Sequence, residues 1–307
     1  PSQLVKANGW IEGLTILSVI LGIVLGGQLV GRTVSGMLLG LDLPVIDTGI
    51  DTPAEGAIAA IMALYLIAAL FNLYIPRTES PLQPLPRRPL SLVRDFSQCN
   101  ARLWNDKLGQ ISLATTTLFW GIGGNMRVIV FPWAAVALGY NVTQASTLGA
   151  VVAIGTAVGA VVAASVTRLD KATGTIPMGI AMGVLIAGLN FVTDVWVAVP
   201  FLILLGAVSG YLVVPMNALL QHRGHNLMGA GRSIAVQNFN EQACILGLSA
   251  LYAAMTRFGA TPFGVITVLG LGVALTMWQI RRWHRRNCVL HFDEVERLLA
   301  IARSDKH

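Results

Sequence analysis

Two charged side chains lie inside long apolar stretches of the sequence. Arg127 is the only charge between Gln110 and Leu138, and Glu241 lies near the middle of the apolar segment 229–256. A guanidinium in a bilayer costs roughly 3 kcal/mol on insertion scales, so such a group usually faces a protein interior or a wet cavity. A guanidinium binds phosphate oxygens in a bidentate fork, and a buried carboxylate needs a partner, a proton or water. These two residues therefore predict a polar ligand site within the membrane.

Other polar residues could complete such a site. The small or polar face that leads back from Arg127 includes Trp120, and an i, i+4 pair joins Gln237 to Glu241. For Arg127 the alternative is snorkelling to the headgroups, because Pro132 could end its span early. For Glu12 the alternative is a carboxylate at a helix start, favoured by the macrodipole. The predicted substrate-binding residues are Arg127, Glu241, Gln237, Asn240, Asn217, Trp120, Asn125, Glu12 and Asn8.

The elements that must position these residues are long apolar helices. The 307 residues are 54% hydrophobic and 12% charged, which is typical of a polytopic all-α membrane protein and not of a soluble domain. Each predicted span is an apolar stretch bounded by charge, Pro or Gly. The eight predicted spans are 8–31, 54–75, 110–131 (with a possible extension to 138), 142–166, 174–193, 196–220, 229–256 and 262–283.

The basic residues fall mainly in alternate loops. With the N-terminus inside, 18 of the 21 Lys and Arg residues lie in inner segments, whereas the outer loop 32–53 carries Asp42, Asp47 and Asp51. The positive-inside rule then places both ends of the chain in the cytoplasm. Because the positive charges are dispersed loop anchors, no nucleic-acid partner is expected despite the net charge of +6.

A Pro-rich linker divides the chain. The first part of segment 76–109 contains five prolines and is predicted to be an extended linker. From Leu92 the segment continues as an amphipathic helix, expected to lie on the inner membrane surface. We therefore predict two spans in 1–75, the linker 76–109, a six-helix bundle in 110–286 and a cytoplasmic tail in 287–307, which could form a short amphipathic helix. The three cysteines suggest no disulfide framework, and no Cys/His spacing fits a metal. No cofactor and no catalytic residue are predicted.

Several sequence blocks resemble a known family. Leu4-Val-Lys-Ala-Asn-Gly9, Phe119-Trp-Gly121 with Arg127, Val214-Pro-Met-Asn-Ala-Leu-Leu-Gln221, and Gly229-Ala-Gly231 with Ile234-Ala-Val-Gln-Asn238 are similar to the bacterial lysophospholipid transporter (LplT) family. That family is a branch of the major facilitator superfamily. The resemblance implies that the chain corresponds to helices 5–12 of twelve and lacks the first four, so that it is truncated at the N-terminus.

The resemblance also implies an activity. Family members move lysophosphatidylethanolamine and lysophosphatidylglycerol to the inner leaflet of the bacterial inner membrane, where a partner acyl-acyl carrier protein synthetase/acyltransferase re-acylates them. Arg127 and Glu241 match the family's intramembrane charged positions on helices seven and eleven. We expect alternating access, in which Arg127 holds the lipid phosphate. Glu241 would pair with Arg127 in the empty site or meet an ethanolamine ammonium in the filled one. Alternatives are a proton-coupled drug exporter, a membrane scaffold or a subunit of a lipid-remodelling enzyme.

Overall fold

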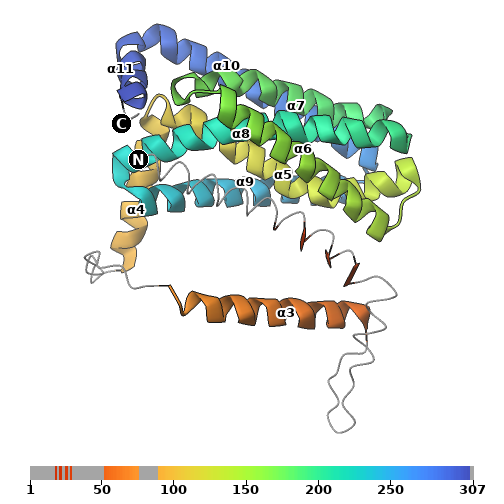
Figure 1. Ribbon diagram of the computed structural model, residues 1–307. Helices are drawn as coiled ribbons and strands as arrows, with labels where there is room; N and C mark the ends of the chain where they lie inside the picture. Colours follow the sequence, from red (N-terminus) through yellow and green to blue (C-terminus); the bar gives the residue numbers. More distant parts are fainter. Residues whose placement is uncertain are drawn as a thin grey trace.

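The structure, a computed structural model, describes residues 52–75 and 89–304, together with a few isolated positions between 18 and 29. Within these residues the secondary structure is helical, and the helices of 109–290 lie side by side as an elongated bundle (Figure 1). The all-α architecture is therefore confirmed. The bounds are α3 Pro53–Asn72, α4 Pro89–Asn105, α5 Gly109–Leu138, α6 Val142–Val166, η1 Leu169–Thr175, α7 Ile176–Gly188, η2 Leu189–Phe191, α8 Val195–Met228, α9 Ala230–Arg257, α10 Pro262–Leu290 and α11 Phe292–Ser304.

Helices form at seven of the eight predicted spans, and the eighth, 8–31, lies almost wholly outside the described residues. Five described stretches are long and apolar enough to cross a membrane, and α5 is a sixth if its two halves are one span. The chain is thus a multi-pass membrane protein. Helix α9 has 28 residues but is not among these stretches, because its first half carries several polar side chains.

Local signals shape the ends of the helices. Asn141 and Gln144 form a capping box at the start of α6, and Gly139 ends α5 with a positive φ of 68° that suits glycine. The two parts of α5, Gly109–Met126 and Val128–Leu138, differ in direction by 48°. Pro132 accounts for a bend at this place, because it cannot bond the carbonyl of Val128 and its ring crowds that group.

Glycines let two pairs of helices approach to backbone contact. On α6, a Cβ added at Gly155 or Gly159 would run into the backbone of α8, at Ile203 and Ala207 respectively. On α8, a Cβ added at Gly206 or Gly210 would likewise run into the backbone of α6. Each helix therefore presents one small-xxx-small motif to the other. Helices α7 and α10 meet similarly, through Gly183 and Gly270. This packing makes the bundle a rigid frame for the polar residues.

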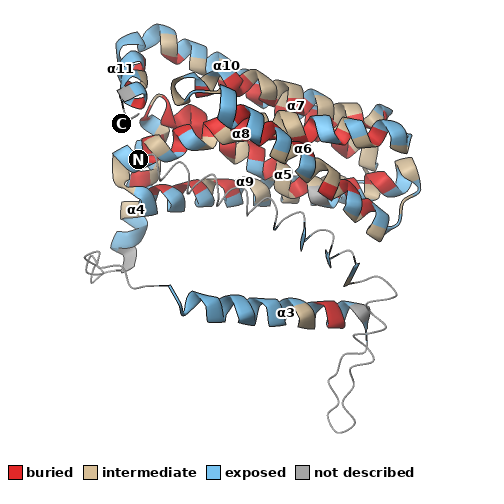
Figure 2. Ribbon diagram, viewed as in Figure 1, coloured by how far each residue is buried: buried red, intermediate tan, exposed pale blue. Residues whose placement is uncertain are grey.

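Helix α4 packs against the bundle with its apolar face. Cys99 and Leu103 are buried in a small cluster with Leu113, Leu220 and Val236, which belong to α5, α8 and α9. Our prediction of an amphipathic helix is confirmed, but the part of its apolar face formed by Cys99 and Leu103 lies on protein and not on the membrane surface. Figure 2 shows α4 mostly exposed near its beginning and partly buried where it meets the bundle. Only the first turns, with Leu92 and Val93, keep large apolar side chains exposed.

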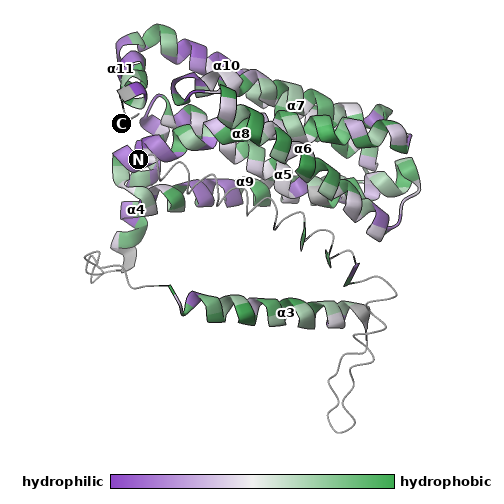
Figure 3. Cartoon of the chain, viewed as in Figure 1, coloured by the Kyte–Doolittle hydropathy of each residue, from purple (hydrophilic) through white to green (hydrophobic). Residues whose placement is uncertain are grey.

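The C-terminal segment also forms a helix that docks on the bundle. Val295, Leu298 and Ala302 of α11 are buried, and Arg303 bonds Asp170 of η1 at 3.2 Å. Helices α4 and α11 therefore lie at one end of the bundle, which we call the α4 end, and hydrophilic residues gather on both (Figure 3). Helix α3, in contrast, exposes nearly all its large apolar side chains, as expected of a helix that faces lipid or other apolar helices.

Candidate functional site

A buried polar cluster joins α8 to α9 within the membrane-spanning part of the bundle. The Gln237 amide donates one hydrogen bond to Glu241 Oε1 at 2.8 Å and another to Asn217 Oδ1 at 2.9 Å. Glu241 is only 8% exposed. Three of the predicted site residues, taken from two helices, are therefore brought together, and we call them the amide–carboxylate cluster.

Asn125 lies elsewhere, in the seam between α5 and α9. Its amide donates to the carbonyls of Gly121 and Ile245 at 2.9 and 3.1 Å, and its oxygen accepts a bond from Ser249 at 2.9 Å. Gly121 is in contact with Cys244 in the same seam. Gly121 meets Cys244, and further along both helices Asn125 meets Ser249, so α5 and α9 run parallel. Since both polar atoms of Asn125 are used in this way, its geometry is that of a helix–helix tie.

The same contacts fix the height of Arg127 relative to Glu241. Asn125 is level with Ile245 and Ser249, so the backbone of Arg127, two residues further along α5, is about level with Ser249. Glu241 lies eight residues earlier on α9, which at 1.5 Å per residue is roughly 12 Å along the helix axis. The Arg127 side chain lies outside the described residues, and a direct Arg127–Glu241 pair, which stays a prediction, would have to bridge this distance.

The remaining predicted site residues are dispersed. Trp120 is 39% exposed on α5 and makes an edge-to-face contact with the ring of Phe119 at 5.3 Å between centroids. Glu12 and Asn8 lie outside the described residues. Asn240 is one residue from Glu241 but points to a different neighbour, α4, because adjacent residues on a helix are about 100° apart.

Asn240 holds α4 against α9 at the α4 end of the bundle. It donates to Asn100 Oδ1 at 2.8 Å and accepts from Trp104 Nε1 at 3.2 Å. The rings of Phe96 and Phe239 meet edge to face at 5.1 Å. This geometry is that of an interhelical tie, and the predicted role of Asn240 in substrate binding gains no support from it.

Replacing Asn240 with leucine should therefore loosen α4. The substitution leaves Asn100 and Trp104 without these bonds, which corresponds to about a tenfold rise in the undocked population. The expected result is about tenfold faster tryptic cleavage after Arg94 and Arg102, while Asn105→Ala, at an exposed residue of the same helix, cleaves at the normal rate. Equal cleavage rates in the two variants would show that the ring contacts alone hold α4.

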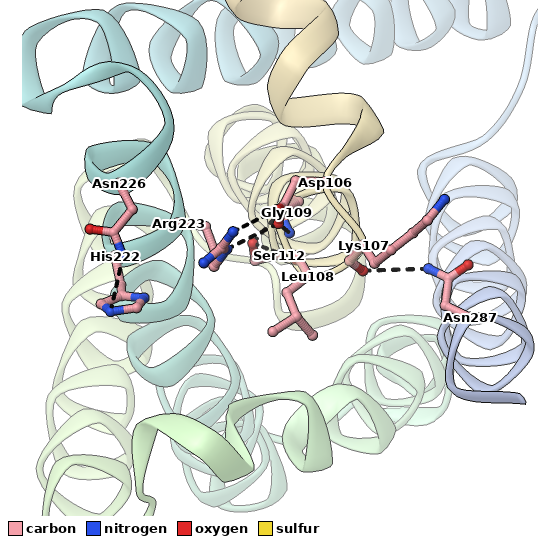
Figure 4. Close-up of polar contacts among 9 residues, drawn as sticks. All are labelled: Asp106, Lys107, Leu108, Gly109, Ser112, His222, Arg223, Asn226 and Asn287. Atoms are coloured by element: carbon pink, nitrogen blue, oxygen red, sulfur yellow. Dashed lines mark hydrogen bonds and ion pairs between the residues drawn. The ribbon is translucent and has the colours of Figure 1, made fainter. Parts of the chain in front are cut away.

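The sequence did not reveal a buried ion pair at the α4 end. Arg223 of α8 binds Asp106, just before α5, through two bonds of 3.1 and 2.7 Å, and the backbone N–H of Gly109 donates to the same carboxylate at 2.7 Å (Figure 4). Their side chains are only 5% and 7% exposed. Arg223 was predicted to be a basic loop residue, because the predicted span ended at residue 220. That prediction is wrong, since α8 continues to Met228 and keeps Arg223 inside the bundle.

Comparison with known proteins finds similar transporters. No protein-family model matches the chain. The chain is 36% identical over 259 residues to the lysophospholipid transporter LplT of Yersinia pestis (strain Pestoides F), and equally to that of Yersinia pseudotuberculosis serotype O:3 (strain YPIII). The aligned part is 84% of this chain and 59% of each relative, so the chain spans about three fifths of their length. This similarity supports the family resemblance: most of the chain is similar to the lysophospholipid transporter LplT.

Proposed function

We propose that the chain takes part in lysophospholipid transport across a bacterial inner membrane. The observation that carries this proposal is a buried carboxylate, Glu241, which accepts a hydrogen bond from Gln237, whose amide also bonds Asn217, inside a chain similar to LplT. Burying a carboxylate in a membrane helix bundle costs free energy, so such a residue usually marks a functional site. Binding of a polar headgroup during transport is a function that fits this site. The chain is thus a transporter component and not an enzyme.

The orientation follows from charge. The α4 end carries the basic residues of α4 and the ends of α8 and α10, so the positive-inside rule makes it cytoplasmic. In this orientation Arg127 lies about 12 Å nearer the outer leaflet than Glu241. A lysophospholipid phosphate from the outer leaflet would meet the Arg127 guanidinium first, because phosphate oxygens fit its bidentate fork. The headgroup would then pass to the amide–carboxylate cluster, where Glu241 can bind an ethanolamine ammonium.

The mechanism we propose is alternating access by two helical bundles. The whole chain would correspond to helices 5–12 of a twelve-helix major facilitator. The glycine-packed helices α5 to α10 would form the second bundle, and α3 with the preceding predicted span would be the last two helices of the first bundle. The single acyl chain would extend along apolar grooves or into lipid. On the cytoplasmic side, an acyl-acyl carrier protein synthetase/acyltransferase would consume the transported lipid by re-acylating it.

Uptake of a labelled lysophosphatidylethanolamine by spheroplasts tests the proposal. Cells that lack their own lysophospholipid transporter should take it up when they express this chain. Arg127→Ala and Glu241→Leu should each lower uptake by about tenfold to a hundredfold, because each removes a charge-assisted contact with the headgroup.

The matched control is Arg257→Ala, at an exposed arginine near the end of α9, which should leave uptake unchanged. Comparable amounts of each variant in the membrane must be verified by immunoblot. Full uptake by Arg127→Ala would remove this residue from the mechanism. Uptake or efflux of amphipathic dyes that follows the proton gradient, without lysophospholipid uptake, would favour the proton-coupled exporter instead.

A further inference from the structure

Helix α9 carries two amides on an open face in the middle of its length. Asn238 and Gln242 are both exposed, and neither has a hydrogen-bond partner among the residues that the structure describes. They are four residues apart and therefore lie one turn apart on the same face. Exposed apolar side chains, Ile234 and Leu246, lie one turn before and one turn after them.

This face is too polar to be an ordinary lipid-facing surface. An amide moved from water into hydrocarbon without a partner costs roughly 2–7 kcal/mol, so two adjacent amides facing acyl chains would strongly oppose insertion of α9. Neither Asn238 nor Gln242 serves as a tie between described helices, whereas Asn125, Asn217, Gln237 and Asn240 all do. The two amides are therefore free to bind a polar group that comes to this face.

Helix α5 carries an aromatic ring at about the same height. The contact of Gly121 with Cys244 sets Trp120 about level with Gln242, and Trp120 is 39% exposed. Gly123, about one turn further along α5, would have nothing within 4 Å of an added Cβ, so there is open space at that position. An apolar ring, open space and two amides together suit a molecule with one apolar and one hydrogen-bonding part.

We propose that Asn238 and Gln242 bind the glycerol backbone of a lysophospholipid and recognise its free hydroxyl. This hydroxyl is what distinguishes a one-chain from a two-chain phospholipid, in which a second acyl group replaces it. It both donates and accepts a hydrogen bond, and a carboxamide offers the complementary acceptor and donors. A site that bonds a hydroxyl discriminates strongly against an analogue that lacks it, because its own polar groups are then left unpaired. The inference rests on the proposed function and adds the residues that select one-chain lipids.

The test compares two ligands that differ only in this hydroxyl. One is a radiolabelled lysophosphatidylethanolamine with a palmitoyl chain, and the other is its deoxy analogue, with hydrogen in place of the free hydroxyl. Binding is measured at equilibrium on the full chain in nanodiscs. The wild-type chain should bind the hydroxyl form about tenfold more tightly, and Gln242→Leu or Asn238→Leu should lose most of this preference, as expected for one hydrogen bond.

The control is Gln279→Leu, which removes an exposed amide of α10 and should keep the tenfold preference. Because Gln242→Leu makes an exposed membrane face more apolar, its folded yield should not fall, so loss of binding cannot be attributed to misfolding. If wild type binds both ligands equally, the inference is wrong while the proposed function stands. If wild type binds neither, the proposed function itself fails. If either leucine variant changes the oligomeric state on size-exclusion chromatography, the face is a protein interface and the inference is overturned.

Discussion

Replacing Arg223 with alanine is expected to destabilise the bundle by about 3–5 kcal/mol, because the Asp106 carboxylate would be left buried without its counter-charge. The two side chains are only 5% and 7% exposed and share two hydrogen bonds. The pair joins the beginning of α5 to the last turns of α8. Thermal unfolding of the purified chain in detergent, followed by circular dichroism, should show a large fall in the midpoint.

The protein contains a matched exposed pair. Arg232 and Asp95 are in contact at 3.1 Å, but their side chains are 51% and 47% exposed. Arg232→Ala should therefore cost at most about 1 kcal/mol, as exposed pairs usually do. If Arg223→Ala costs no more than Arg232→Ala, the Asp106–Arg223 pair is not buried in the folded protein.

A double variant separates the effect of the two charges from the effect of the space that the side chains fill. Asp106→Asn with Arg223→Met removes both charges while asparagine can still accept the bond from Gly109 N–H. Replacing a buried ion pair by neutral groups of similar volume is often neutral or stabilising, so most of the loss should be recovered. Such recovery would mean that the pair is retained for the register of α5 against α8 rather than for stability, and the double variant should then be assayed for uptake.

Replacing Gly159 with alanine should be similarly damaging. The added methyl group would run into the backbone of Ala207, which cannot move aside as a flexible side chain can, so α6 and α8 must separate. The expected loss is about 3 kcal/mol or more, at the upper end for overpacking, together with a sharp fall in folded yield. Fluorescence-detected size-exclusion chromatography of a tagged chain measures that yield directly.

Gly272 of α10 is the control for this substitution, since an added Cβ there would have nothing within 4 Å. Alanine has the higher helix propensity, so Gly272→Ala should keep or raise stability, by up to about 1 kcal/mol. Tolerance of Gly159→Ala to the same degree would show that α6 and α8 are further apart than in the structure.

Much of the helical framework could be predicted from the sequence. Long apolar runs and the charges, prolines and glycines that bound them act locally, so they predicted helices close to seven of the observed ones. The boundaries were less accurate where a helix continues in polar residues. Helix α8 extends eight residues past the predicted end at 220, because Arg223 finds a buried counter-charge that hydropathy cannot reveal.

The sequence by itself determined the fold class, the polarity of α9 and the identity of Glu241 and Gln237 as neighbours, because these depend on composition and on the i, i+4 repeat of one helix. Only the tertiary structure decided what each polar side chain contacts. Asn217 completes the cluster, Asn125 and Asn240 tie helices together, and Asp106 finds Arg223 117 positions along the chain. The reason is that these contacts depend on the height and rotation of whole helices, which backbone contact at glycines such as Gly159 and Gly210 sets between distant segments.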